Sequence, residues 1–429
     1  MKGNRLNSRV ELVGRLRLWR RVGRKETLMK RSLFVIILCA GVTLGISIGL
    51  RQSLGLFLTP ISLDLGLGRE VFALGVGLMN LVWGVLAPFA GALSDRYGVG
   101  RVAVAGGLAY AGGLVVMTLS GDGNQLILGG LLIGVGLSGT GFTVVLGAVG
   151  RAAPEAQRSQ ALALTSVGGS IGQFAALPFA HVLIEQFGWA ASLVVLAGTA
   201  LLMVALAAGM VRGKPPQEEA ATQGLAESLR EAWDHRGFWL LTIGFFVCGF
   251  HLAFVAVHLP AYLADAGMPS WLAATALTIV GIANIIGTMA CGWLGARYPK
   301  ALVLSLLYLG RAVIFLLFLL LPLSETSVLI FAATMGLLWL GTVPLTSGLV
   351  AAIFGPAYMS TLFGIVFLSH QVGGFLGAWM AGWLYDRFAS YDAMWWLSVV
   401  LALVSAALHW PIDERPLARP RAARASSLA

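Results

Sequence analysis

The sequence predicts an all-α membrane protein in which twelve transmembrane helices form two six-helix bundles. The first reason is composition: 58% of the 429 residues are hydrophobic and 11% are charged, whereas a soluble domain has about 25% charged residues. The apolar residues also lie in long blocks, many of which exceed the roughly 20 residues that cross a bilayer core. A third reason is that short motifs recur in both halves. The strands of an outer-membrane barrel would instead show short alternating segments.

The apolar blocks define the expected helices. The first six are predicted near residues 33–62, 71–94, 101–120, 125–149, 158–184 and 189–211. The last six are predicted near residues 238–263, 271–295, 300–322, 327–352, 361–384 and 391–411. The bundles therefore span residues 33–211 and 238–411, and a polar linker at 212–237 joins them and has room for a short surface helix. The C-terminal tail covers residues 412–429. The basic tail at 1–32 either lies on the membrane surface or is disordered, unless translation begins at Met29.

Lysine and arginine orient the expected helices, because cytoplasmic loops are enriched in these residues. The tails, the linker and the loops on the same side hold 25 of the 29 cationic residues. The other side holds Arg69 and Arg387. We therefore expect a multi-pass protein of the cytoplasmic membrane with both termini in the cytoplasm. The net charge of +10 fits contact with an anionic leaflet and not a nucleic-acid partner, which would need a basic surface on a soluble fold.

Two motifs recur in corresponding helices, as expected of a transporter built from repeats. Gly91-Ala-Leu-Ser-Asp95-Arg96-Tyr97-Gly98 follows the second helix, and Gly292-Trp-Leu-Gly-Ala296-Arg297-Tyr298-Pro299 follows the eighth, 201 residues later. Similarly, Gly168-Gly169-Ser-Ile-Gly172 in the fifth helix matches Gly373-Gly374-Phe-Leu-Gly377 in the eleventh. Two matched pairs in the same order indicate an internal repeat.

The loop from Gly91 to Gly98 resembles the signature loop between helices 2 and 3 of the major facilitator superfamily, and the likeness covers roughly residues 33–411. It departs from the family where Val99-Gly100-Arg101 replaces two adjacent basic residues, and Ala296 replaces the acid of the second half, so that the second loop should be the weaker latch. The resemblance implies alternating access governed by these loops. The residues expected to form this conformational gate are Gly91, Asp95, Arg96, Gly98, Arg101 and Arg297.

Within the superfamily, the chain looks most like monocarboxylate transporters and oxalate/formate antiporters. Segments 45–57, 161–169 and 382–388 carry this likeness. Animal monocarboxylate transporters have a basic residue close to Arg51, although alignment puts it nearer Gln52. The Gly-Pro motif of drug/proton antiporters is missing from the fifth helix, since Gln173 follows Gly172. The resemblance therefore implies an anionic substrate.

The charged residues support the same substrate class independently. All 19 acidic residues fall in loops, in tails or at helix ends, but Arg51 and Arg311 lie well inside apolar spans. A charge near the bilayer centre costs about 2.5–3.5 kcal/mol and usually faces a cavity or a partner. Arginine binds carboxylates through directional, bidentate hydrogen bonds. Arg51 could alternatively snorkel towards the interface, and Arg311 could bond backbone carbonyls.

Histidines and amides complete the predicted substrate site. His251 and His258 are seven residues apart and so share one face of the seventh helix, and His370 and Gln371 occupy the middle of the eleventh. Imidazole can donate to an anion or carry a proton. Interhelical hydrogen bonding is the alternative role for each of these groups. The full predicted set is Arg51, Gln52, Asn80, His251, His258, Asn284, Arg311, His370 and Gln371.

We therefore expect a secondary transporter, acting as a monomer, that moves a small organic anion such as a monocarboxylate, with proton symport favoured over anion exchange. An exporter of drugs or neutral metabolites and a membrane sensor are the alternatives. No catalytic constellation is apparent, so an enzyme is not expected. Cys39, Cys248 and Cys291 lie in apolar spans without metal-ligand spacing, so neither a disulfide, a metal nor another cofactor is predicted.

Overall fold

A computed structural model describes residues 33–210, 225–355 and 359–417. The expected tail at 1–32, residues 211–224, which include the first part of the expected linker, residues 356–358 and residues 418–429 lie outside these ranges. A first helix covers residues 33–53 and continues through η1 (Leu54–Phe57) and α2 (Leu58–Leu65). The helices that follow are α3 (Arg69–Tyr97), α4 (Val99–Thr118), α5 (Gly123–Thr140), α6 (Phe142–Ala152), α7 (Glu155–Ala207), η2 (Ala208–Met210), α8 (Leu225–Asp234), α9 (Arg236–Asp265), α10 (Ser270–Arg297), α11 (Lys300–Leu320), α12 (Glu325–Leu337), α13 (Thr342–Phe354), α14 (Met359–Phe388) and α15 (Asp392–His409).

The expected twelve spans are confirmed once one long helix is divided. Within the described residues, 11 stretches are long and apolar enough to cross a membrane, and one of them, Leu164–Met210, has 47 residues. At 1.5 Å per residue this stretch would be about 70 Å long, more than twice the thickness of a bilayer core. It turns at Gly188, whose φ of 75° is a conformation that glycine adopts without steric cost. The fifth and sixth predicted helices therefore cross separately.

Two helices predicted as continuous are broken, which corrects the sequence expectation. The helix expected at 125–149 divides into α5 and α6 at Gly141, where the backbone is extended. The helix expected at 327–352 divides into α12 and α13 around residues 338–341. Both breaks lie inside apolar runs, so hydropathy gave no sign of them. The fourth and tenth predicted helices of the chain, which are the fourth helix of each bundle, are therefore interrupted at comparable places.

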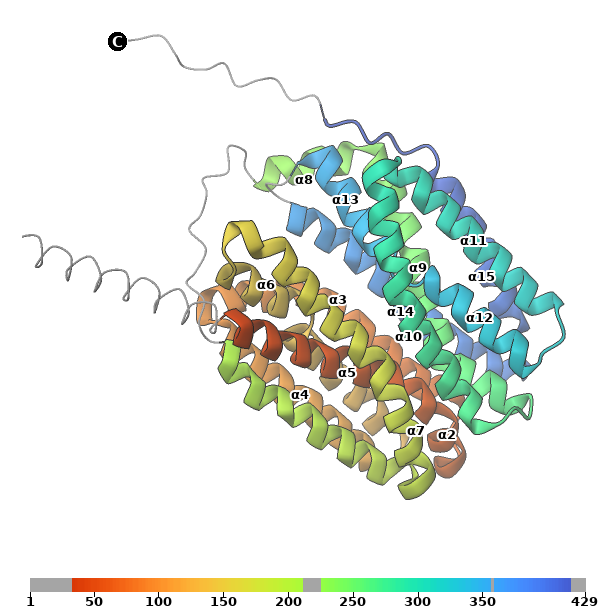
Figure 1. The fold of residues 1–429 in the computed structure, drawn as a ribbon. Helices are drawn as coiled ribbons and strands as arrows, with labels where there is room; N and C mark the ends of the chain where they lie inside the picture. Colours follow the sequence, from red (N-terminus) through yellow and green to blue (C-terminus); the bar gives the residue numbers. More distant parts are fainter. Residues whose placement is uncertain (1–32, 211–224, 356–358, 418–429) are drawn as a thin grey trace, which may run out of the picture.

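The two halves of the chain form two adjacent bundles (Figure 1), and the repeated glycine motif packs the same pair of helices in each. A Cβ on Gly168 or Gly172 of α7 would collide with the backbone of Gly41 or Gly45 in the first helix. In the second bundle, a Cβ on Gly373 or Gly377 of α14 would collide with backbone carbonyls of α9. Small residues allow membrane helices to approach this closely.

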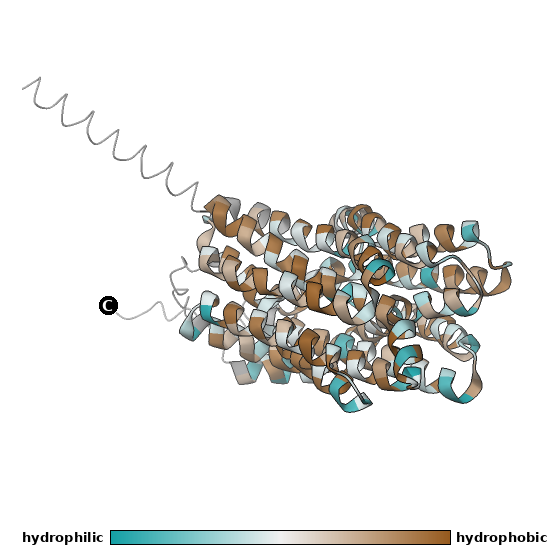
Figure 2. Cartoon of the chain, turned by 90° about the horizontal axis from the view of Figure 1, so that it is seen from below, coloured by the Kyte–Doolittle hydropathy of each residue, from teal (hydrophilic) through white to brown (hydrophobic). Residues whose placement is uncertain are grey.

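The outer surface suits a bilayer. Figure 2 shows hydrophobic residues along the helices and hydrophilic residues mostly near their ends. Many large apolar side chains lie on the outer surface; Met289, for example, is 72% exposed. One end of the molecule carries the surface helix α8 and the α3–α4 turn at Gly98; we call it the linker face. The opposite end, with turns at residues 66–68, 266–269 and 389–391, is the short-loop face.

Candidate functional site

Arg51 lies at the junction of the two bundles and is hydrogen-bonded to a neutral side chain. Its Nε and Nη2 donate to Asn80 Oδ1 at distances of 3.0 and 2.7 Å. Asn80 Nδ2 donates to the backbone oxygen of Val76 in its own helix at 3.0 Å, and this fixes Oδ1 towards the guanidinium. The ring of Trp83, one turn further along α3, is 5.4 Å from the guanidinium carbon. The Arg51 residue as a whole is partly buried.

The second bundle reaches this position through α14. Gln371 Nε2 donates to the backbone oxygen of Asn80 at 3.4 Å, and Gln371 Oε1 lies 2.9 Å from His370 Nδ1. Because an amide oxygen only accepts, Nδ1 carries the proton of a neutral His370. The structure thus brings together four of the predicted residues, Arg51, Asn80, His370 and Gln371, which we call the central polar group. Gln52 is buried one position after Arg51.

Arg311 and Asn284 contact the break between α12 and α13, and Arg311 Nη2 also donates to Cys248 Sγ at 3.6 Å, beside His370 of the central polar group. Arg311 is fully buried, and its Nη2 donates to the carbonyl oxygens of Leu338 and Trp339, each at 2.6 Å. Asn284 Oδ1 accepts from the backbone N–H of Leu340 at 3.0 Å. Carbonyls at a helix end have no partner within the helix, so an arginine that satisfies them stabilises the break. The alternative role considered for Arg311, bonding to backbone carbonyls, is what its contacts support.

The two histidines of α9 contact different elements of the second bundle. His251 Nε2 lies 3.0 Å from the carbonyl oxygen of Ser398 in α15, and its ring packs against Phe315. His258 contacts α14 and the residue that precedes α15. Both rings are fully buried. His251 therefore links helices within one bundle, whereas His258 belongs to a polar cluster at the short-loop face.

The signature loop lies at the linker face. Gly98 has a φ of 93° and forms the tight turn between α3 and α4, and Gly91 approaches Thr143 of α6. The Arg96 guanidinium lies 5.3 Å from the ring of Tyr97, Arg101 is exposed, and Arg297 stacks on Trp293 at 3.9 Å. The side chain of Asp95 lies outside the described part of the structure. The gating role of this loop remains a prediction.

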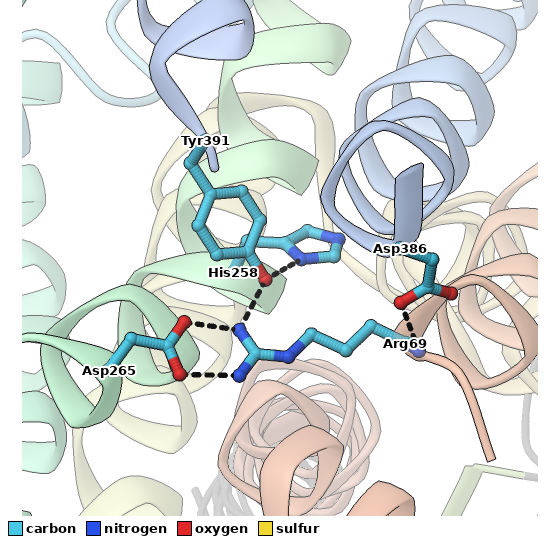
Figure 3. Close-up of polar contacts among 5 residues, drawn as sticks. All are labelled: Arg69, His258, Asp265, Asp386 and Tyr391. Carbon is cyan, nitrogen blue, oxygen red and sulfur yellow. Dashed lines mark hydrogen bonds and ion pairs between the residues drawn. The ribbon is translucent and has the colours of Figure 1, made fainter. Parts of the chain in front are cut away.

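A second polar cluster joins the bundles at the short-loop face (Figure 3), and sequence reasoning did not predict it. Arg69, the first residue of α3, forms a bidentate ion pair with Asp265 at the end of α9, with Nη1 2.7 Å from Oδ2 and Nη2 2.5 Å from Oδ1. The side chains of Arg69 and Asp265 are 11% and 31% exposed. Partial burial reduces solvent screening, so the pair contributes more than a fully exposed one.

Asp386, near the end of α14, caps the start of α3 from the other bundle. Its Oδ1 and Oδ2 accept the backbone N–H groups of Arg69 and Glu70 at 2.9 and 2.7 Å. The first N–H groups of a helix have no partner within the helix and favour negative charge. A side chain at Gly68 would collide with this carboxylate. Glu70 adds a further contact between the bundles, accepting from Trp379 Nε1 at 3.1 Å.

Tyr391 connects the ion pair to His258. Its hydroxyl accepts from Arg69 Nη1 at 2.9 Å and lies 3.1 Å from His258 Nδ1, while His258 Nε2 lies 2.8 Å from the carbonyl oxygen of Ala378. Burial raises the pKa of the Tyr391 phenol well above its ordinary value, against an opposing effect of Arg69. The phenol therefore keeps its proton and remains a donor. We call Arg69, Asp265, Asp386, Tyr391 and His258 the short-loop gate.

The sequence did carry a signal for the short-loop gate. Arg69 is one of two cations predicted on that side, where acids such as Asp265 and Asp386 end helices. Which acid pairs with Arg69 depends on the packing of three helices separated by about 200 and 300 residues. Charge counting therefore indicated an exceptional arginine but could not identify its partners.

The sequence profile of the Major Facilitator Superfamily matches residues 33–378. The chain belongs to this superfamily. It is therefore a transporter protein of the membrane, built on the major facilitator fold, which points away from an enzyme.

Similar proteins agree with this assignment. Rat monocarboxylate transporter 13 is 26% identical over 84% of both chains. Human monocarboxylate transporter 11 is 27% identical, covering 86% of this chain and 80% of its own. The uncharacterized transporter YcxA of Bacillus subtilis (strain 168) is 24% identical, covering 87% and 93%. In fold, the chain matches a crystal structure of a bacterial homologue of the human lysosomal transporter Spinster with a TM-score of 0.72 and 15% identity, over 88% of this chain and 96% of that one.

We predict that Asp265→Asn loosens the short-loop face. A hydrogen bond to a charged group contributes roughly 1.5–3 kcal/mol, and partial exposure reduces this, so we expect a shift of about tenfold towards separated bundles. Ala73 of α3 is fully buried against Gly382 of α14. A cysteine introduced there should react about tenfold faster with a maleimide in the Asp265→Asn protein.

Glu325→Gln provides the matched control, because Glu325 is an exposed acid at the same face. It should leave the labelling rate of the cysteine at position 73 unchanged. Equal rates in the parent and Asp265→Asn would show that the ion pair does not hold the bundles together.

Proposed function

We propose that this protein moves a small organic anion of the monocarboxylate class by alternating access, with the proton as its coupling ion. The observation that carries the proposal is the environment of Arg51. Its guanidinium lies among membrane-spanning helices, and its described hydrogen bonds reach only the neutral Asn80. A charge in this environment is costly unless it gains a partner. A carboxylate substrate supplies that partner.

A bidentate contact with a carboxylate would use two of the Arg51 guanidinium nitrogens. Arg51 uses Nε and Nη2 towards Asn80, and a carboxylate that pairs with Nη1 and Nη2 competes for one of these bonds. Asn80 is in turn contacted by Gln371 from the other bundle. Binding of an anion therefore perturbs the central polar group at the point where the bundles meet. The bundles, which we take as residues 33–211 and 238–411, then rearrange about this point within a monomer.

The relatives support the substrate class, because several proteins named monocarboxylate transporters are similar to this chain over most of their length. An exporter of neutral compounds would gain nothing from an unneutralised arginine between its halves. Anion exchange would use the same site without a proton. Uptake in the presence and absence of a pH gradient distinguishes symport from exchange.

We further propose that the linker face is cytoplasmic, since 25 of the 29 cationic residues belong to that side. A cysteine at Arg230, on the exposed helix α8, should resist a membrane-impermeant maleimide in intact cells, while one at Gly121 in the α4–α5 turn should react. Cys39, Cys248 and Cys291 would first be replaced by serine. The opposite labelling pattern would reverse the orientation.

Removing the cation should abolish tight anion binding. Because a hydrogen bond to a charged group contributes roughly 1.5–3 kcal/mol, Arg51→Gln should weaken carboxylate binding by about ten- to a hundredfold. Arg51→Lys keeps the charge but not the planar fork and should recover part of the affinity. Equilibrium binding of a panel of labelled monocarboxylates to purified protein, and their uptake into proteoliposomes with and without a pH gradient, measure the effect.

Asn80→Asp provides a second test, because it leaves Arg51 intact but gives the guanidinium a permanent carboxylate partner. This variant should fold as well as the parent and should still lose anion binding. Arg387→Gln removes an arginine that is exposed at the short-loop face and stacked on Trp383, and it should bind as the parent does. Unchanged affinity in both Arg51→Gln and Asn80→Asp would place the substrate elsewhere.

A further inference from the structure

The donor and the acceptor can be assigned for each hydrogen bond that links Arg69, Tyr391, His258 and Ala378. The carbonyl oxygen of Ala378 can only accept, so His258 Nε2, 2.8 Å away, must carry the proton. His258 Nδ1 is then the acceptor of a neutral ring, and Tyr391 donates to it over 3.1 Å. The Tyr391 oxygen in turn accepts from Arg69 Nη1 at 2.9 Å. Donation therefore passes from Arg69 through Tyr391 to His258 (Figure 3), and from His258 to the carbonyl oxygen of Ala378.

The surroundings of His258 favour the neutral ring while the gate is closed. His258 is fully buried, and one hydroxyl separates it from the Arg69 guanidinium. The nearby carboxylates are engaged elsewhere, Asp265 with the guanidinium, Asp386 with backbone N–H groups and Glu70 with Trp379. The remaining titratable neighbours are Tyr262 on its own helix, Tyr385 of α14 and Asp392 at the start of α15.

We propose that His258 is a proton-binding site that competes with Arg69, so that acid opens the short-loop face. A proton on Nδ1 converts the acceptor of the Tyr391 hydroxyl into a donor and places a second cation beside Arg69. His258, Tyr391 and Ala378 belong to the second bundle, whereas Arg69 belongs to the first. Separation of the bundles removes Arg69 and admits water to the ring, and the proton then reaches Nδ1 from the solvent at this face.

The proposal fixes the direction in which pH shifts the balance between the open and closed states. The open state binds the proton more readily than the closed state, so lowering the pH favours the open state. Each unit of pH can change the ratio of open to closed molecules by at most about tenfold for a single proton. The inference rests on the proposed function only in naming the proton as the second ligand of the transporter. It requires no knowledge of the anion.

The experiment measures the separation of the bundles in substrate-free protein. Spin labels on cysteines replacing Leu63 and Phe388, which are 78% and 68% exposed at the short-loop face of the two bundles, report that separation by pulsed electron resonance. Between about pH 8 and pH 5, the range in which a hydrated imidazole gains its proton, the parent should shift towards longer distances. His258→Gln should remain closed throughout, because its amide can donate to Ala378 and accept from Tyr391.

His409→Gln is the matched control. His409 is also buried in the second bundle, but its ring packs against Tyr308 and Gly244 towards the linker face, so the pH response should persist. Tyr391→Phe keeps the imidazole but removes the bridge to Arg69, and it should weaken the response. A parent protein without a pH response would overturn the proposal. An undiminished response in His258→Gln would show that another group titrates. An undiminished response in Tyr391→Phe would show that the hydroxyl bridge to Arg69 does not carry the competition. Either result would also overturn the proposal. The anion-binding experiments on Arg51 are unaffected by either result.

Discussion

An arginine side chain among apolar helices must satisfy its charge and its hydrogen-bond donors without bulk water, and this constraint shapes the molecule at three levels. Arg69 meets it at the short-loop face through a carboxylate and a phenol. Arg311, deep in the second bundle, donates to the carbonyls of a broken helix through Nη2, while its buried Nη1 has no hydrogen-bond partner among the described residues. Arg51 meets it only in part, through an uncharged amide. Of the three arginines, Arg51 is the one beside the contact between α3 and α14 at mid-span, which is where we propose that the transported ligand is held.

The central polar group and the short-loop gate are joined by the same pair of helices. Asn80 and Arg69 both belong to α3, and Gln371 and Asp386 both belong to α14. Contacts between these two helices therefore occur at mid-span and at one face of the molecule. A change at Arg51 and a change at Arg69 bias the same interface, which is what coupling between two sites requires. The helix break that Arg311 contacts lies between α12 and α13, not between α3 and α14.

The sequence predicted the features that follow from composition and local spacing. Apolar run length defined the spans, and the paired glycine motifs indicated the repeat that packs α7 on the first helix and α14 on α9. The breaks at Gly141 and at residues 338–341 could not be predicted, because a helix break inside an apolar run depends on partners such as Arg311 and Asn284 from other helices. Arg51 and Asn80 were identified separately from their polarity, but their contact depends on helix packing. The sequence likewise could not separate His370, which joins the central polar group, from His258, which joins the gate.

The central claim is that Arg51 recognises a carboxylate, and the most direct test compares pairs of ligands that differ in charge alone. Calorimetric titration of the purified protein with a short monocarboxylate and with its primary amide holds size and shape nearly constant. The account predicts that the carboxylate binds at least about tenfold more tightly than the amide, since a hydrogen bond to a charged partner contributes roughly 1.5–3 kcal/mol. It also predicts that Arg51→Gln removes this preference. Equal binding of acid and amide by the parent protein would contradict it.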